Sequence, residues 1–181
     1  MQLDTGMTVE QRFDAFQEQI LKVLRASGNT ILDRSQVTLR EFAPFAPDLK
    51  IVEMVSDREW ILRLCGTNHC DRAKCDRTGV NVLENKNAAE CAERKTIKDA
   101  MFAYSCGAKI TWREQFLASK SALTIGMSYP AFGKNGERMI IVYQLLEEGS
   151  SSVEHDDPTR LSSVDLISSE FIDLGHGVPG D

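Results

Sequence analysis

The chain has 181 residues, of which 42% are hydrophobic and 27% charged, so it is long enough for one domain with extensions and apolar enough for a single core. It has no run of about eighteen apolar residues and no basic region followed by an apolar stretch at its start, so we expect a cytoplasmic protein without a membrane span or secretory signal. Residues 147–181 hold nine acids and one base, which leaves +2 for residues 1–146, and this near-neutral body argues against nucleic acid as a partner.

A helix is predicted from Thr8 to about Ala26, within an N-terminal segment of residues 1–28. Thr8 and Gln11 form a capping box at its start, and Gly28 lies just past its end. Its apolar residues are spaced alternately four and three apart, as in a heptad seam. These residues are Val9, Phe13, Phe16, Ile20 and Val23. One interpretation is a helix that packs on its own domain. The other, which predicts a homodimer, is a helix whose five seam residues form the dimer interface.

Two short strands are predicted after a turn that contains two prolines. Residues 29–47 are expected to form a short helix or turn that leads the chain onto a sheet edge. The run from Leu49 to Val55 is apolar and β-branched, and the run from Glu59 to Cys65 alternates between apolar and polar residues. The three residues between these runs are typical of a hairpin turn.

Helices separate this hairpin from three further strands. A short helix is predicted from about residue 67 to 74, and a longer one from residue 87 to about 104. An Asn-Gly pair at 135–136 favours a hairpin reversal between the last two strands. Apolar alternation predicts the three strands themselves at residues 109–117, 122–129 and 138–146.

Residues 148–181 differ from the rest of the chain in composition. Residues 148–158 are charged and Ser-rich, which favours a flexible linker. Residues 161–174 regain enough apolar side chains to dock on the body of the chain or on a partner. The predicted organisation is therefore an N-terminal helix (1–28), a central domain (29–147) and an acidic C-terminal segment (148–181).

The chain has five cysteines, an odd number in a chain without an export signal, so we expect reduced thiols. The most suggestive cluster is His69-Cys70 followed by Cys75, because thiolates and imidazoles bind metals. The spacing lacks the paired Cys-x2-Cys units of structural zinc sites and the Cys-x-x-Cys-His of covalent haem attachment. We therefore predict no metal site. The remaining cysteines are Cys65, Cys91 and Cys106.

Signatures of catalysis are absent from the sequence. It has no Gly-rich phosphate loop, no Gly-x-Ser-x-Gly turn and no His-Glu-x-x-His helix. Before the tail, His69 is the one histidine that offers an acid or base at neutral pH, and Cys70 or Cys75 is the nearest nucleophile. Adjacency in sequence does not place these side chains within reach of each other. We predict that the chain is not an enzyme.

The order of predicted elements, together with several short motifs, resembles the PAS domain family, a five-stranded sensory fold, and in particular the bacterial single-domain type known as PAS-5. The resemblance covers about residues 33–146. It implies an α+β fold with a five-stranded antiparallel sheet and helices on one face, plus the N-terminal helix. The motifs that carry it are Asp33 to Ser35, Ala43 to Leu49, Arg63 to Thr67 and Gly79, with a further similarity at Asp173 to Pro179.

The resemblance implies a sensor of small molecules or redox state, or a dimerisation module, built around an apolar pocket. The chain lacks the cysteine-containing segment of PAS domains that use flavin photochemistry, and residues 87–106 hold no histidine for haem. The cofactor therefore stays open. The central domain is followed by no kinase, cyclase or DNA-binding domain in this chain, so the resemblance implies signalling through self-association or a separate partner protein.

A ligand pocket is predicted from periodicity between the long helix and the sheet. Tyr hydroxyls and the Trp N–H are suited to fix the polar end of a ligand there. The alternative is that the same aromatic and Met side chains are plain core. A second alternative for the whole chain is a ligand-free protein–protein interaction module, indicated by the heptad seam and the acidic tail. The predicted pocket residues are Met101, Tyr104, Trp112, Phe116, Met127 and Tyr143.

Overall fold

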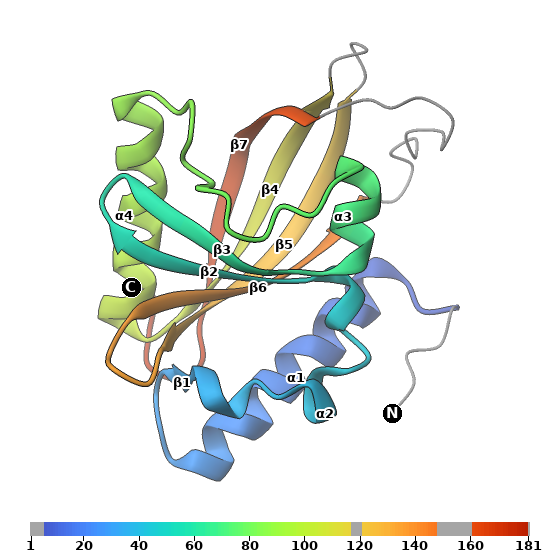
Figure 1. The fold of residues 1–181 in the computed structure, drawn as a ribbon. Coiled ribbons are helices and arrows are strands. Elements are labelled where there is room, and N and C mark those ends of the chain that lie inside the picture. The colour runs from blue at the N-terminus through green and yellow to red at the C-terminus, as the bar shows by residue number, and fades with distance from the viewer. Residues whose placement is uncertain (1–5, 117–120, 148–160, 181) are drawn as a thin grey trace.

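The computed structural model describes residues 6–116, 121–147 and 161–180, in which one mainly antiparallel sheet lies between two groups of helices (Figure 1). Within these residues the strands are β1 (Leu32–Asp33), β2 (Leu49–Ser56), β3 (Glu59–Cys65), β4 (Gly107–Phe116), β5 (Ser121–Phe132), β6 (Arg138–Leu146) and β7 (Leu161–Ile172). The sheet runs in the order β3-β2-β6-β5-β4-β7, and β1 pairs in parallel with β5. The predicted α+β class is confirmed. The predicted number of five strands is wrong, because β1 and β7 extend the sheet.

The two long helices begin where local capping chemistry predicts, whereas the short helix at Thr67–Ala73 follows Gly66 and has no side-chain cap. Capping boxes open the two long helices, with Thr8 and Gln11 at one and Asn87 and Glu90 at the other. Gly28 ends the first helix in the left-handed conformation, at φ 71°. The α-helices are α1 (Val9–Ser27), α2 (Leu39–Phe42), α3 (Thr67–Ala73) and α4 (Ala88–Tyr104), and single 3-10 turns lie at η1 (Arg34–Gln36) and η2 (Ala46–Asp48).

Helix α1 packs on one face of the sheet through an aromatic core. The ring of Phe16 lies 4.7 Å from that of Tyr143 and 5.1 Å from that of Phe45, measured between centroids. Four of the five predicted seam residues are buried here within their own chain, namely Phe13, Phe16, Ile20 and Val23, while Val9 is partly buried against them. The prediction that this seam forms a dimer interface is therefore wrong for the described fold. The heptad spacing arises because α1 lays a narrow apolar stripe across a sheet of its own chain.

The opposite face of the sheet carries α3 and α4 (Figure 1). Strand alternation separates the two faces: on β6, Ile141 and Tyr143 belong to the α1 core, while Ile140 packs with the α4 residue Met101. The segment between α3 and α4 covers the β2–β3 hairpin, with Leu83 packed against Trp60 and its neighbours.

The junction between β3 and α3 depends on glycine. Gly66 donates its backbone N–H to the carbonyl oxygen of Leu49 at 2.8 Å, so the start of α3 lies close to the start of β2. A Cβ atom at Gly66 would collide with the carbonyl oxygens of Ala46 and Pro47. Only glycine permits this approach, and it sets where the first turn of α3 lies over the sheet.

The C-terminal segment docks on the body of the chain as a strand. Strand β7 pairs antiparallel with β4 along its length, from Gly107 opposite Ile172 to Phe116 opposite Leu161. The sequence predicts that this segment docks either on the body of the chain or on a partner. The structure shows that it docks on the body of the chain. The predicted linker over residues 148–158 lies outside the described residues. No helix in the described ranges is both long and apolar enough to cross a membrane.

Phe16→Ala tests whether α1 belongs to the core of its own chain. The variant removes a fully buried ring, so we expect the free energy of unfolding to fall by about 3–5 kcal/mol, measured by chemical denaturation. Glu18→Ala, at an exposed position of the same helix, is the matched control. A loss below about 1 kcal/mol for Phe16→Ala, together with a change in oligomeric mass, would support the dimer seam instead.

Candidate functional site

A cavity of about 130 Å³ lies between α3, α4 and the sheet. An engineered dry cavity of about 150 Å³ accommodates benzene, so this one has room for a ligand about as large as an aromatic ring. The cavity lies against α4, the long helix that is predicted to border the pocket, but the residues that line it differ from those predicted. Much of its apolar wall consists of Val52, Leu62, Leu83, Ile140 and Val142.

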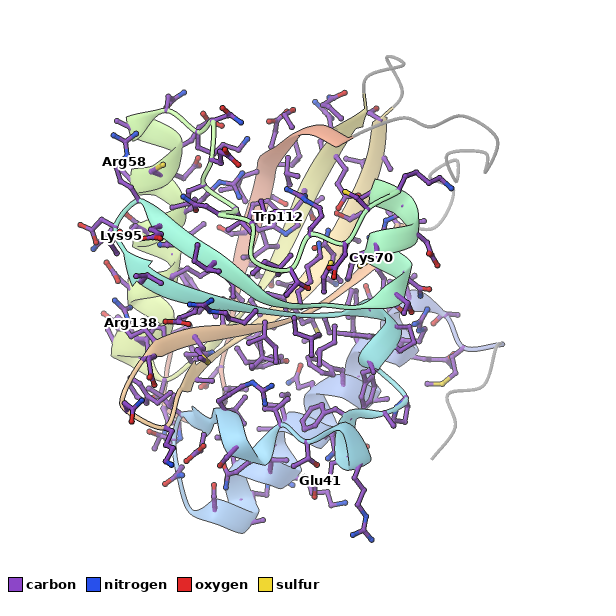
Figure 2. All side chains as sticks on the ribbon, viewed as in Figure 1. Glu41, Arg58, Cys70, Lys95, Trp112 and Arg138 are labelled. Atoms are coloured by element: carbon purple, nitrogen blue, oxygen red, sulfur yellow. The ribbon has the colours of Figure 1, made fainter. Side chains whose placement is uncertain are left out.

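Of the predicted pocket residues whose side chains the structure describes, Trp112 alone lines this cavity. Figure 2 shows it in the interior, whereas Lys95 on α4 lies toward the outside. Met101, predicted to line the pocket, is fully buried in the packing of α4 on the sheet, and Tyr104 is 45% exposed. The prediction is wrong for both, because the cavity lies nearer the first half of α4, beside Arg94 and Lys98.

The predicted pocket residues Met127 and Tyr143 lie on the other face of the sheet. Both are buried in the core beneath α1, so their assignment to the pocket is wrong. The predicted alternation along β5 places Ile125, Met127 and Tyr129 on one face, as the structure shows, but alternation does not reveal which face meets which helix. The side chain of Phe116 lies outside the described part of the structure.

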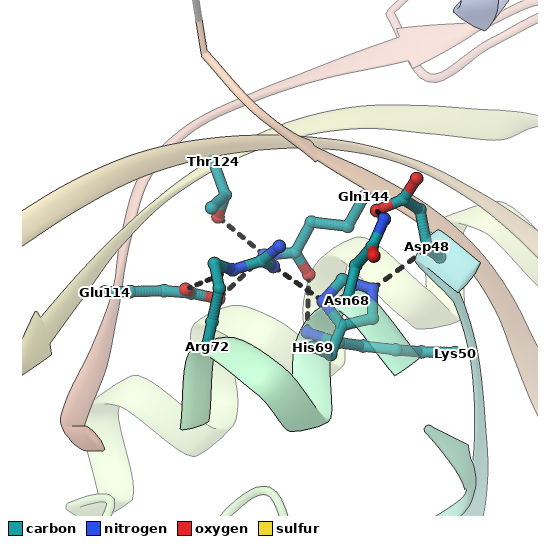
Figure 3. Close-up of polar contacts among 8 residues, drawn as sticks. All are labelled: Asp48, Lys50, Asn68, His69, Arg72, Glu114, Thr124 and Gln144. Carbon is teal, nitrogen blue, oxygen red and sulfur yellow. Dashed lines mark hydrogen bonds and ion pairs between the residues drawn. The ribbon is translucent and has the colours of Figure 1, made fainter. Parts of the chain in front are cut away.

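A chain of hydrogen bonds and ion pairs borders the cavity (Figure 3). Lys50 Nζ donates to Gln144 Oε1 at 2.9 Å, and Gln144 Nε2 donates to Glu114 Oε1 at 3.1 Å. Gln144 Nε2 also donates to Thr124 Oγ1 at 2.6 Å. The other carboxylate oxygen of Glu114 lies 3.5 Å from Arg72 Nε, an ion pair that joins β4 to α3. The buried Glu114 carboxylate is thus neutralised within this network.

His69 continues the network in a fixed tautomer. Arg72 Nη2 lies 2.6 Å from His69 Nδ1, and since a guanidinium only donates, Nδ1 accepts. His69 Nε2 therefore carries the proton and donates to the carbonyl oxygen of Asp48 at 2.9 Å. Burial, with the charges of Lys50 and Arg72, lowers the pKa of His69 to about 2. His69 is therefore a neutral positioning group in the physiological range.

Asp48 connects the two helical layers. Its carboxylate accepts hydrogen bonds from Arg12 Nη2 of α1 at 2.7 Å and from Asn68 Nδ2 of α3 at 2.8 Å. Arg12 Nε also donates to the hydroxyl oxygen of Tyr143 at 3.1 Å. With the backbone contact to His69, Asp48 holds α1, the start of β2 and α3 in one arrangement.

Several residues that line the cavity have buried polar atoms without a hydrogen-bond partner, although one of these atoms, Arg72 Nε, forms the ion pair with Glu114. Among the described residues, four buried side-chain N or O atoms make no hydrogen bond: Trp60 Nε1, Arg72 Nε, Arg94 Nε and Ser128 Oγ. All four residues line the cavity. Native proteins pair nearly all buried polar groups, so several unpaired ones in residues that line one cavity are unusual and call for an explanation.

Positive charge exceeds negative charge around the cavity. Its lining contains five cationic side chains and, in the described ranges, one carboxylate, Glu114. Burial lowers the pKa of Lys50 to about 8 and that of Lys98 to about 7. Both shifts show that these ammonium groups lie away from water. The cationic residues are Lys50, Arg72, Arg77, Arg94 and Lys98.

The cysteines form no disulfide within the described residues, which hold all five thiols. Cys65 lines the cavity, and burial together with a hydrogen bond to Cys70 raises the pKa of its thiol. Its thiol is thus held in the protonated, unreactive form. No cluster of three or more His, Cys, Asp or Glu side chains in the described ranges has the arrangement to hold a metal ion.

Sequence reasoning missed most of the polar lining, although two signals point to it. Glu114 lies two residues after Trp112 on β4, so the same alternation that places Trp112 inward places Glu114 inward. Arg94 and Lys98 are one helical turn apart, on the stretch of α4 that also carries the buried Ile97. Charged residues at inward positions are a stronger sign of a site than aromatic residues there.

Comparison with protein family models, with curated proteins and with solved structures finds no match to this chain.

Asp48→Asn tests the junction between the layers. The variant keeps the size of the side chain but loses the charged acceptor of Arg12, so we expect the free energy of unfolding to fall by about 1.5–3 kcal/mol in urea denaturation. Asp57→Asn, an exposed acid on the β2–β3 turn, is the control. Equal small effects for the two variants would show that Asp48 does not organise the fold.

His69→Gln tests the pKa of the buried imidazole. Since folding lowers the pKa of His69, the unfolded chain takes up a proton below about pH 6.5 while the folded chain does not. The buried histidine therefore does not lower the free energy of unfolding well above that pH. Below it, each pH unit lowers the free energy of unfolding by up to about 1.4 kcal/mol. We expect wild type to lose about 2 kcal/mol more than His69→Gln between pH 6.5 and 5, measured by urea denaturation.

The exposed His176→Gln controls for the substitution itself. Parallel pH profiles for wild type and His69→Gln would show that His69 is free to take up a proton in the folded protein.

Proposed function

We propose that the chain is a PAS-type sensory domain that binds a small organic molecule in the cavity between α3, α4 and the sheet. The support from the fold is the order of elements: the β2–β3 hairpin, then α3 and α4, then the β4, β5 and β6 strands, with β6 returning to pair with β2. This order is the one that carries the resemblance to PAS domains. Strands β1 and β7 and helix α1 are additions to it.

The observation that carries the proposal is a group of buried, unpaired polar atoms in residues that line the cavity. A space left by imperfect packing is lined by apolar atoms. Here Trp60, Arg94 and Ser128 all line the same space, each is less than 9% exposed, and each has a buried polar atom without a hydrogen-bond partner. Leaving such atoms unpaired costs about 1–3 kcal/mol each. A ligand that pairs with them recovers this cost, which favours a binding site over plain core.

The chemistry of the lining supports binding without catalysis. The two hydrogen bonds of His69 and its low pKa leave it without the free imidazole that a general base requires. Cys65, the thiol that lines the cavity, has a raised pKa and is not an activated nucleophile. We therefore propose a sensor rather than an enzyme.

The output of the sensor is proposed to pass through a separate partner protein or through self-association, and its site of action is proposed to be the cytoplasm. The competing interpretation, a ligand-free interaction module, is supported by the heptad seam on α1 and by the acidic tail. Since four seam residues lie in the core of their own chain, the support from the seam is lost. A homodimer, if formed, uses another surface.

The chain has two tryptophans, Trp60 and Trp112, and both line the cavity. Intrinsic tryptophan fluorescence therefore reports on this space alone. We expect a screen of ring-sized organic fragments to yield ligands that change this fluorescence and raise Tm, because filling the cavity adds contacts only in the folded state. Val142→Phe places a ring into the cavity, so we expect it to abolish the response.

Val55→Phe, the same substitution at an exposed position of β2, is the control and keeps the response. Denaturing mass spectrometry of the protein as purified adds a search for a bound molecule. If no fragment changes the fluorescence of wild type and no molecule co-purifies, the cavity is a packing defect and the proposal fails.

A further inference from the structure

Two cationic side chains of α4 face the cavity from adjacent turns of the helix. Arg94 and Lys98 both line the cavity, and they are 8% and 5% exposed. Like charges four residues apart on a helix repel each other. Burying both in one wall makes the repulsion stronger, because little water separates them. The arrangement disfavours the charged form of Lys98 unless a negative group lies between the two cations and the opposite wall.

Lys98 has no anionic partner among the described residues. Its one hydrogen bond is a weak contact from Nζ to the Sδ atom of Met101 at 3.7 Å. The causes that lower its pKa are burial and the charge of Arg94, and no acidic group opposes them. A buried ammonium group has three donors and a large desolvation cost. Two of its donors thus remain for a bound molecule.

Arg94 is held in position while its Nε–H group makes no hydrogen bond. Its Nη2 donates to the carbonyl oxygen of Val164 on β7 at 2.6 Å, and its guanidinium stacks over the Trp112 ring at 4.6 Å. These two contacts fix the plane of the guanidinium. Its Nε atom makes no hydrogen bond. Trp60 Nε1 and the Ser128 hydroxyl add two more buried groups able to donate.

Glu114 does not neutralise this end of the cavity. Its two carboxylate oxygens are engaged by Gln144 Nε2 and by Arg72, on the side of the cavity bordered by α3. Glu90, Glu93 and Asp165, outside the lining, stabilise the charge of Arg94, whereas no acidic group among the described residues does so for Lys98. A neutral ligand would accept hydrogen bonds there but would not balance this charge.

Apolar side chains form the rest of the wall, including Val52, Leu62, Ile140 and Val142. A fully hydrated inorganic anion would lose its water shell against these surfaces without regaining contacts. A ligand with an apolar body and one anionic end matches both parts of the cavity.

We propose that the ligand is a small organic carboxylate, about the size of benzoate, whose carboxylate binds Lys98 and Arg94 while its apolar body fills the space toward β2 and β6. This inference rests on the proposed function and names the ligand class of that site. Paired with an anion, Lys98 is held in its charged form, and the repulsion between the two cations of α4 is offset. The neighbouring donors of Trp60 and Ser128 favour a ligand with oxygen acceptors.

The test compares three probes on the full chain by tryptophan fluorescence titration: benzoate, neutral benzyl alcohol of similar size, and inorganic phosphate. We expect benzoate to bind more tightly than benzyl alcohol, and phosphate not to compete with it. Lys98→Met keeps the length of the stem and removes the charge, so we expect benzoate affinity to fall about ten- to a hundredfold and benzyl alcohol binding to be retained.

Lys95→Met is the matched control, because Lys95 lies one turn earlier on α4 and pairs with Asp99 outside the cavity. We expect it to leave the affinity for benzoate unchanged. If benzyl alcohol binds wild type as tightly as benzoate, the anion inference is overturned while the proposed function stands. Binding of phosphate without binding of benzoate also overturns it. If no probe binds, both the inference and the ring-sized site fail. The comparison of benzoate with benzyl alcohol on the wild-type protein tests the inference even if Lys98→Met does not fold.

Discussion

The carboxylate of Asp48, 4% exposed at the start of β2, joins two helices that lie on opposite faces of the sheet. Arg12 reaches it from α1, and Asn68 reaches it from α3, while the backbone oxygen of Asp48 fixes the tautomer of His69. A buried carboxylate without these partners would carry a large desolvation cost. Because all three contacts must form together, the position of α3 over the sheet is coupled to the packing of α1 beneath it. Gly66 allows the close approach that this arrangement needs.

The two faces of the sheet differ in polarity. Beneath the sheet, α1 contributes a continuous aromatic core in which Phe16 touches Tyr143. Above it, α3 and α4 do not close on each other, and charged side chains fill much of the space between them. The network around Glu114 satisfies the α3 end, whereas Lys98 at the α4 end has no anionic partner among the described residues. Such an unequal distribution of partners is expected at a binding site, where stability is given up for function.

Much of the fold follows from local sequence signals, and most of the site does not. The capping boxes at Thr8 and Asn87 and the bounds of β3 and β6 are predicted from the sequence, because they depend on neighbouring residues. Strand β7 is not predicted as a strand, because its sequence is rich in Ser and it pairs with β4, which is distant in sequence. No local signal indicates that pairing. The face on which α1 packs is equally non-local, so Tyr143 is predicted on the wrong side. The cavity itself is formed by charged residues that a search for aromatic periodicity overlooks.

A crystal structure of the full chain grown with benzoate tests most directly whether this space is an anion-binding site. We expect electron density for the ligand between α4 and the sheet, with a carboxylate oxygen within hydrogen-bond distance of Lys98 Nζ and Arg94 Nε, and the ring against Val142. A cavity closed by repacked side chains, or benzoate bound only at the surface while Lys98 pairs with a carboxylate of its own chain, would contradict it.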